Sequence, residues 1–424
     1  MWQRMTLTGP AMLLGAVSAK VRSFVNQFSK GFWTFFAAAL FFDLGFGVFF
    51  FLFNLYLTDL HFDERSVGQI SAWLTLGNVV GSFPAILVAR RHGMRPLLLF
   101  SFIAGPLFCA LRLFFLAESA QRGLAFCTGV ALCCWPVCFS PTVAKVSDER
   151  TRTTAFSLVF ATGIGMGTLS GLAGGYMPQL LHAVGSHSTV VMSIRYVLLG
   201  ACGVAMLGLW PIWKLQIDRS FSSISQRARI VHPFLFRFLP PFILWCVVTG
   251  SFPGFAAIYL QQSLGVPLGK IGAAFSGSQL AQFLAVLCAP LLFRRAGMIR
   301  GVMSAQLMTA LFLVSIACTR NAGLSIGYFI AYSGMQFMCG PGIYCLLMER
   351  IPEQERSTAS AIQNVSGALC QAGTAVVTGS CIVRFGYPVV LIANAAVAVA
   401  AALLFLTIPS ATLLPEEVQK AIPA

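Results

Sequence analysis

The sequence predicts an all-α integral membrane protein with about twelve transmembrane helices in two pseudo-symmetric six-helix bundles. Three observations carry this prediction: the composition, a series of apolar runs of membrane-spanning length, and an internal repeat. Hydrophobic residues make up 57% of the 424 residues and charged residues only 10%, whereas soluble domains carry about 25% charged residues. A chain this apolar cannot cover a water-facing surface, so lipid must be its solvent.

The apolar runs give the positions of the expected helices, since a transmembrane helix needs about 20 predominantly apolar residues. Charged or Pro/Gly-rich breaks separate twelve runs. They cover 33–58, 67–89, 96–117, 123–146, 155–176, 193–213, 236–260, 268–293, 299–319, 324–348, 358–382 and 389–408.

The longest internal polar stretch falls between the sixth and seventh runs and is the expected linker between two halves. The predicted organisation is a cytoplasmic N-terminal segment 1–32, an N-terminal bundle 33–213, a cytoplasmic linker 214–235, a C-terminal bundle 236–408 and a cytoplasmic tail 409–424. Residues 11–19 also resemble a short signal-peptide core, so processing of the first segment is the alternative.

The positive charges predict the orientation in the membrane. A net charge of +15 could indicate a nucleic-acid partner, but the charges form short clusters between apolar runs. Most lysine and arginine residues fall on one set of alternate loops, and the other set holds Arg65, Arg122, Lys270, Arg320 and Arg384. This asymmetry predicts that both termini are cytoplasmic, in a cell (inner) membrane, with lipid and no nucleic acid as a partner.

Two loop motifs show the internal repeat. Arg90-Arg91-His92-Gly93-Met94 follows the second run, and Arg294-Arg295-Ala296-Gly297-Met298 follows the eighth. Arg152-Thr153-Thr154-Ala155 follows the fourth run, and Arg356-Ser357-Thr358-Ala359 follows the tenth. Both pairs share one interval, because 294 − 90 equals 356 − 152. Six helices per half put both copies on the same membrane side, which predicts a pseudo-two-fold axis along the membrane normal.

On these residues the chain resembles the major facilitator superfamily of transporters over 33–408. That family carries Gly-x-x-x-Asp-Arg-x-Gly-Arg-Arg after its second helix. Arg91, Gly93 and Arg95 fit its last part, as Arg295 and Gly297 do in the second half, while Arg90 and Arg294 replace the acid. The resemblance implies a small-molecule solute, a central cavity between the halves, alternating access and a monomeric protein that is not an enzyme.

The charged loops at the ends of the second, fourth, eighth and tenth runs are candidate gate residues. Their basic and acidic members could pair to hold the cytoplasmic side closed, or could only anchor the loops at lipid headgroups. They are Arg90, Arg91, Gly93, Arg95, Asp148, Glu149, Arg152, Arg294, Arg295, Gly297, Glu349, Glu353 and Arg356.

Asp43 is the only acidic residue deep inside an apolar run. An acid at mid-membrane costs about 2.5–3.5 kcal/mol on insertion scales, so it is rarely kept without a use or a partner. Asp43, Gly47, Phe50 and Asn54 share one helical stripe that should face the cavity. Asp43 could carry a proton or bind a cationic group of the solute, or it could only hold helices together through a hydrogen bond.

Neutral amides inside other runs are candidate solute contacts, because they form hydrogen bonds without the cost of a charge. They also serve as contacts between helices, worth about 0.6 kcal/mol each. Together with Asn54 they are Asn78, Gln279, Gln282, Gln336, Gln363, Asn364 and Gln371.

Two further features concern packing. The fifth run is rich in glycine, which predicts close helix approach; the residues are Gly163, Gly165, Gly167, Gly171, Gly174 and Gly175. Arg112 and Arg195 lie near the outer ends of their runs and are expected to extend towards the lipid headgroups.

The sequence contains no phosphate-binding loop, no nucleophile motif and no cluster with metal-ligand spacing, so no cofactor or metal is expected. The favoured function is secondary active transport of a small polar, cationic or amphipathic solute, proton-coupled through Asp43. The alternatives are a uniporter in which Asp43 is structural, and a lipid-moving or signalling membrane protein with the same fold.

Overall fold

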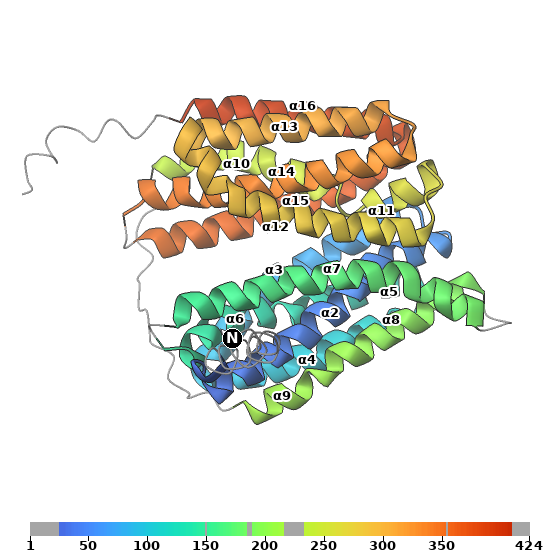
Figure 1. Ribbon diagram of the computed structural model, residues 1–424, viewed down its shortest axis with the longest axis vertical. Coiled ribbons are helices and arrows are strands. Elements are labelled where there is room, and N and C mark those ends of the chain that lie inside the picture. The colour runs from blue at the N-terminus through green and yellow to red at the C-terminus, as the bar shows by residue number, and fades with distance from the viewer. Residues whose placement is uncertain (1–24, 149–150, 185–188, 216–232, 353–354, 409–424) are drawn as a thin grey trace, which may run out of the picture.

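The computed structural model describes residues 25–148, 151–184, 189–215, 233–352 and 355–408, and these contain helices but no strand. The expected N-terminal segment, linker and C-terminal tail lie largely outside these ranges. The helices form two groups, one from each half of the chain, which stand beside one another (Figure 1).

The first group contains one helix for each of the first six apolar runs, two of which are broken into two helices. It consists of α2 (Lys30–Asp59), α3 (Glu64–His92), α4 (Arg95–Leu111), α5 (Glu118–Leu132), α6 (Cys134–Val146), α7 (Arg152–Val184), α8 (Val190–Leu207) and α9 (Leu209–Lys214).

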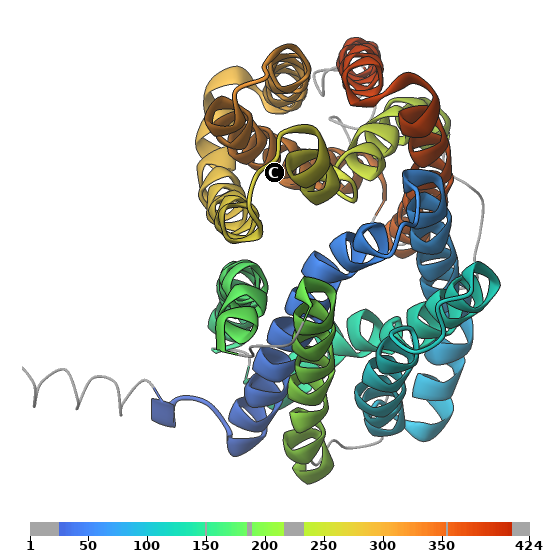
Figure 2. The same ribbon diagram turned by 90° about the vertical axis from the view of Figure 1, so that its right-hand side faces the viewer.

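The second group follows the same plan and is seen with the first in end-on view in Figure 2. It consists of α10 (Phe234–Ser251), α11 (Ala256–Ile258), the π-helical η1 (Tyr259–Ser263), α12 (Leu268–Ala296), α13 (Met298–Cys318), α14 (Ala322–Arg350), α15 (Arg356–Phe385) and α16 (Tyr387–Leu406).

Local sequence explains where these helices begin and end. The side chains of Ser29, Asp63 and Asn321 accept hydrogen bonds from backbone N–H groups in the first turns of α2, α3 and α14, which satisfies donors that a helix start leaves free. Gly93 and Gly297 end α3 and α12 with φ of 84° and 82°, a conformation that glycine adopts without strain. The two copies of the repeat therefore end these helices in the same way.

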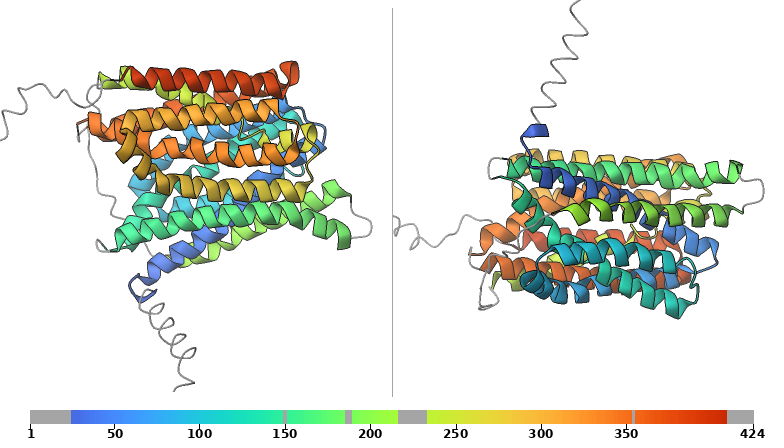
Figure 3. Two further views of the ribbon diagram at one scale, coloured as in Figure 1. Left: turned by 45° about the horizontal axis from the view of Figure 1, so that its top comes forward. Right: turned by 90° about the horizontal axis from the view of Figure 1, so that it is seen from below.

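Ten helices or helix pairs in the described part of the chain are long and apolar enough to cross a membrane. The other two predicted segments correspond to α4, an apolar helix of 17 residues, and to α14, whose 29 residues include several polar and small side chains. Each of the twelve predicted segments therefore corresponds to one or more helices of the all-α membrane fold. The long helices run along one common direction (Figure 3), as membrane-spanning helices must.

Three predicted segments are not single helices. The segment 123–146 breaks at Cys133, just before Pro136, and 193–213 breaks at Gly208 before Pro211. The segment 236–260 ends its long helix at Ser251 and turns through Pro253 and Gly254. Proline removes a helix hydrogen bond and clashes with the preceding turn, which explains each break.

The outward-facing surface is apolar. Large side chains that are more than half exposed include Phe83, Leu180, Leu287, Leu311 and Val377. A soluble protein rarely exposes so many, whereas a protein surrounded by lipid must. The outer surface therefore agrees with the composition in requiring a bilayer.

The two halves meet along two helix pairs, α3 with α15 and α7 with α12 (Figures 1 and 2). We call the end where α9 stops and α10 starts the linker end, and the end where α2 passes into α3 the far end. Ser276 Oγ donates a hydrogen bond to the Thr168 carbonyl at 2.7 Å, and Asn54 Nδ2 donates to the Gly254 carbonyl at 3.0 Å. Both bonds join the halves in their far-end portions.

Glycine allows close backbone approach at this far-end interface. A Cβ atom at Gly272 of α12 would lie 2.7 Å from Gly175 Cα and would collide with the Gly171 carbonyl of α7. A Cβ atom at Gly68 of α3 would likewise collide with the Ala375 carbonyl of α15. Close approach at Gly171 and Gly175 was the packing role predicted for the glycine-rich fifth run.

The two contacts are related by the repeat. Gly68 corresponds to Gly272 and Gly171 to Ala375, because 272 − 68 and 375 − 171 equal the interval between the loop motifs. Gly175 corresponds to Gly379, whose added Cβ would collide with the Glu64 carbonyl. The far end is therefore closed by two copies of one helix contact.

Candidate functional site

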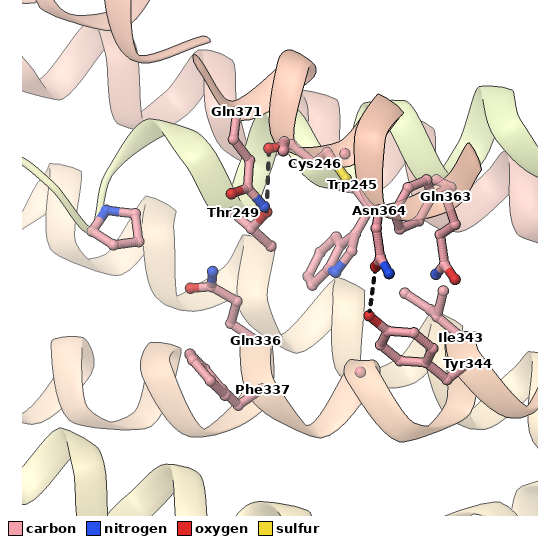
Figure 4. A pocket seen from close by; sticks show the side chains of 15 residues that line it. Trp245, Cys246, Thr249, Gln336, Phe337, Ile343, Tyr344, Gln363, Asn364 and Gln371 are labelled. Atoms are coloured by element: carbon pink, nitrogen blue, oxygen red, sulfur yellow. Dashed lines mark hydrogen bonds between the residues drawn. The ribbon is translucent and has the colours of Figure 1, made fainter. Parts of the chain in front are cut away.

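Two cavities lie inward of the far-end interface. The larger, which we call the amide cavity, has a volume of about 490 Å³ and lies within the second half (Figure 4). The smaller, which we call the inter-half cavity, has a volume of about 330 Å³ and is lined by both halves. These volumes fall at the lower end of the usual range for small-molecule sites.

The amide cavity is built from α10, α14 and α15. Its polar residues are Thr249, Gln336, Tyr344, Gln363, Asn364 and Gln371, and its main aromatic residues are Phe242, Trp245 and Phe337. Tyr344 Oη donates to Asn364 Oδ1 at 3.2 Å, and Gln371 Nε2 donates to Thr249 Oγ1 at 3.3 Å (Figure 4). These bonds between helices hold both amides against the wall of the cavity.

Gln363 is the most buried of these amides. Its side chain is 1% exposed, and its Oε1 atom has no hydrogen-bond partner among the described residues. A buried acceptor without a donor costs about 1–3 kcal/mol. Because Gln363 lines the cavity, a solute or water that brings an N–H or O–H group would remove that cost.

The inter-half cavity receives small and aromatic residues from the first half and polar residues from the second. Helices α2 and α7 contribute Gly47, Phe50, Phe51, Gly167, Ser170 and Gly171, and the second half contributes Pro253, Phe275, Ser278, Gln279, Gln282, Phe329, Ser333, Gln336 and Phe337. Pro253, Gln336 and Phe337 line both cavities, so the two spaces adjoin.

Among the described residues, no acidic or basic side chain lines either cavity. Neutral amides, hydroxyls and aromatic rings form hydrogen bonds and stack, but they cannot neutralise a solute charge. The chemistry of both walls suits an uncharged polar molecule.

Asp43 lies one turn of α2 away from Gly47, towards the linker end. It lines neither cavity and is only partly buried. On α7, a Cβ atom added at Gly163 would lie 3.4 Å from Asp43 Oδ2. The absence of a side chain at Gly163 leaves space beside the carboxyl group.

Among the other predicted residues, six amides line a cavity and two do not. Gln279, Gln282, Gln336, Gln363 and Gln371 line one or both cavities, as does Asn364 next to Gln363. Asn54 instead spans the halves through its bond to Gly254. Asn78 lies on α3 beside Gly129 of α5, away from both cavities.

The candidate gate residues gather at the linker end. Arg95 Nη2 donates to the Trp213 carbonyl at 2.6 Å, which ties α4 to α9. Arg91, Asp148, Arg294, Arg295 and Glu349 are exposed, and no ion pair joins them within the described part of the chain. Gly297 and Glu349 line a third cavity at this end. Glu149 and Glu353, and the side chains of Arg90, Arg152 and Arg356, lie outside the description, so pairing of these loops stays a prediction.

The prediction that the Arg112 side chain extends to the lipid headgroups is wrong. Its side chain is 2% exposed, its guanidinium carbon lies 4.0 Å from the centre of the Phe53 ring, and its Nε donates to Gln121 Oε1 at 3.3 Å. The loop after α4 folds back over this group, because Gln121 Nε2 also donates to the carbonyls of Arg112 and Phe115. Hydropathy alone cannot distinguish this buried arginine from one at the surface.

Sequence reasoning missed the aromatic and hydroxyl residues of the amide cavity. Trp245, Thr249 and Tyr344 line this cavity, yet in an apolar helix an inward-facing aromatic residue cannot be distinguished by sequence from a lipid-facing one. A usable signal exists on α10, where Phe242, Cys246 and Thr249 fall at helical spacing on the stripe that lines the cavity.

Two pseudo-symmetric helix groups, an interface between them and a central solute-sized space are the architecture of a class of membrane transporters. The chain belongs to the Major Facilitator Superfamily, whose profile matches residues 35–375. The fold class and family resemblance predicted from the sequence are therefore confirmed, and the chain is a membrane transporter that binds a small-molecule solute. No curated protein matches the sequence.

Solved structures share the fold at low sequence identity. The nucleoside transporter NupG has a TM-score of 0.73 at 13% identity, covering 89% of this chain and 98% of that one. A bacterial homolog of the human lysosomal transporter Spinster, in an inward-facing and occupied conformation, has a TM-score of 0.71 at 12% identity, with coverage of 91% and 96%. A D-xylose-proton symporter has a TM-score of 0.69 at 15% identity, with coverage of 89% and 98%.

Proposed function

We propose that this chain is a secondary active transporter that moves an uncharged polar solute by alternating access, driven by protons through Asp43. The observation that carries the proposal is the pair of adjoining cavities with amide, hydroxyl and aromatic walls and no charged lining. Among the solutes predicted from the sequence, polar molecules fit these walls, whereas a cation would lack a counter-ion there.

The conformation proposed is one that faces the cytoplasm. Closed glycine contacts and hydrogen bonds join the halves at the far end, and the loop charges predict that the linker end is cytoplasmic. The bundles 33–213 and 236–408 are the proposed rigid units, and breaking the far-end contacts while closing the linker end would expose the cavities to the other side. The gate arginines would then meet their acids at the linker end.

Asp43 is the proposed proton carrier because it is the only acid deep within the described apolar helices. Its place beside Gly163 and one turn from Gly47 puts it close to the inter-half cavity without lining it. A proton bound there could influence how α2 packs on α7 while the solute is held by the second half. Coupling would then pass through movement of helices and not through solute contact.

A uniporter is the second candidate, and one observation favours it. Asp43 makes no hydrogen bond or ion pair with any described residue, so no relay from it to the cavities is built into this conformation. In a uniporter the carboxyl group would stay protonated and would only fill space between α2 and α7.

The test is uptake into proteoliposomes with a panel of labelled nucleosides, sugars, amino acids and organic cations, with and without an inward proton gradient. Wild-type chain, Asp43→Asn and protein-free liposomes are compared, and a pH-sensitive dye follows proton entry. Proton-dependent accumulation of a neutral solute that is lost in Asp43→Asn supports the proposal. Equal gradient-independent uptake by both proteins supports the uniporter, and uptake of cations alone contradicts the proposed solute class.

A further inference from the structure

The inter-half cavity and the amide cavity adjoin as two compartments that share Pro253, Gln336 and Phe337 in their linings. Helix α14 runs past both, so that Ser333 lies on the inter-half side, Tyr344 lies on the amide side, and Gln336 and Phe337 border both. Gln336 is 7% exposed and can donate to one side while accepting from the other. A molecule bound across the two compartments would therefore meet the Gln336 amide, which lines both.

The amide cavity has the chemistry of a site for a planar ring. Trp245, Phe242 and Tyr344 offer aromatic surfaces for stacking. The unpartnered Gln363 oxygen is nine-tenths buried and requires a donor from the ligand. A heterocycle that carries a ring or exocyclic N–H group supplies both the flat face and the donor.

The inter-half cavity has the chemistry of a site for hydroxyl groups. Ser278 Oγ donates to the Phe275 carbonyl at 2.7 Å, which leaves its oxygen free to accept from a ligand. Gln279 and Gln282 form no hydrogen bond with other described side chains, so each presents both a donor and an acceptor. Several such groups of both kinds around one space can bind the hydroxyl groups of a neutral polyol, and the phenylalanine rings of the same wall can pack on its C–H faces.

We propose that one neutral solute fills both compartments, with a planar N–H-bearing ring in the amide cavity and an attached hydroxyl-rich part in the inter-half cavity. A ring N-glycoside, such as a nucleoside, is the chemical class that meets both requirements. This inference rests on the proposed transport function and narrows its solute class.

The experiment measures affinity of the purified full chain for uridine and adenosine, for the bases uracil and adenine, and for D-ribose, by isothermal titration. At least one nucleoside is expected to bind at least tenfold more tightly than its base or ribose binds alone, because both compartments contribute to its affinity. Nucleosides that bind no tighter than their separate parts would overturn the inference.

Variants in the two compartments sharpen the test. Gln363→Leu should weaken binding of nucleoside and base alike by about three- to tenfold, the effect of one neutral hydrogen bond. Gln282→Leu should weaken nucleoside by a similar factor and leave the base unchanged. Gln179→Leu, the same change at an exposed residue outside both cavities, should change neither. Thermal unfolding checks each variant, and Gln363→Asn replaces Gln363→Leu if that protein does not fold.

The outcomes separate this inference from the proposed function. If Gln282→Leu and Gln363→Leu affect base and nucleoside equally, the site has one compartment and the inference is wrong. If no nucleoside binds but the chain accumulates a sugar, the inference also fails while the transport function stands. If no solute of the uptake panel moves, the proposed function itself is wrong.

Discussion

The two halves of the molecule share a scaffold but differ in what they present to the central cavities. At the interval set by the repeat, Gln336, Gln363 and Gln371 of the second half correspond to Leu132, Val159 and Gly167 of the first, because 336 − 132, 363 − 159 and 371 − 167 are equal. The first half carries the partly buried acid Asp43, whereas α10, the matching helix of the second half, contains no acid. Duplication has kept the helix ends and the interface and has changed the middle of the helices.

This difference indicates that the two halves have different roles in transport. The amide side chains proposed to bind the solute lie mostly in the second half, and Asp43, the proposed proton carrier, lies in the first. The far-end interface is the part in which the halves remain alike, since each supplies one glycine contact of the same design. Three predictions test this comparison, from the largest expected effect to the smallest.

The largest effect is expected from Gly272→Leu at the shared interface. Its side chain would collide with backbone of α7, and overpacking costs about 1–3 kcal/mol. Closure of the far end should become less favourable by about 5- to 150-fold, and the uptake rate in proteoliposomes should fall accordingly. Gly327→Leu is the matched control, because no atom lies within 4 Å of its added Cβ; equal rates in the two variants would contradict this account of the interface.

An intermediate effect is expected from Gln371→Leu in the amide cavity. The variant loses the bond to Thr249 and one polar group of the wall, so KM should rise about three- to tenfold with little change in the maximal rate. Asn78→Leu makes a comparable change in the first half outside both cavities and should leave KM within about twofold. If Asn78→Leu raises KM as much as Gln371→Leu does, solute binding is not concentrated in the second half.

The smallest effect is expected from Asn54→Ala. This residue joins the halves by one neutral hydrogen bond to the Gly254 carbonyl, worth about 0.5–1.5 kcal/mol. The uptake rate should change about two- to fivefold, with KM nearly unchanged, since Asn54 lines neither cavity. Thr34→Ala, which loses only a bond to Lys30 of its own helix, serves as the control, and a large rise in KM for Asn54→Ala would place this amide at the solute instead.

Most of the fold follows from the sequence because lipid imposes a strong constraint on helix length and on loop charge. The same interval relates the two contacts of the far-end interface. Adding it to Gly68, Gly171 and Gly175 gives their counterparts in the second half, Gly272, Ala375 and Gly379. Neither pairing was identified from the sequence, because an isolated glycine in an apolar helix does not reveal which neighbour approaches it.

The candidate site was predictable only where a polar residue stands out in an apolar run. Gln363 and Gln371 lie on the cavity wall as the amide pattern indicated, whereas Asn54 and Asn78 carry the same signal but lie elsewhere. Trp245 and Tyr344 gave no signal, because an aromatic residue is equally at home facing lipid. The burial of the charged residue Arg112 was not predictable either. It depends on contacts with Phe53 and Gln121 that form only when the loop after α4 folds back.

The most direct test of these separate roles of the two halves compares solute exchange with proton-driven accumulation. It uses Asp43→Asn and Gln371→Leu in proteoliposomes of the same composition. Asp43→Asn should exchange labelled for unlabelled solute at a near wild-type rate but should no longer accumulate it against a gradient. Gln371→Leu should exchange poorly at low solute concentration and still couple to protons at saturation. If Asp43→Asn accumulates solute normally, or loses exchange together with accumulation, the assignment of coupling to the first half and binding to the second is wrong.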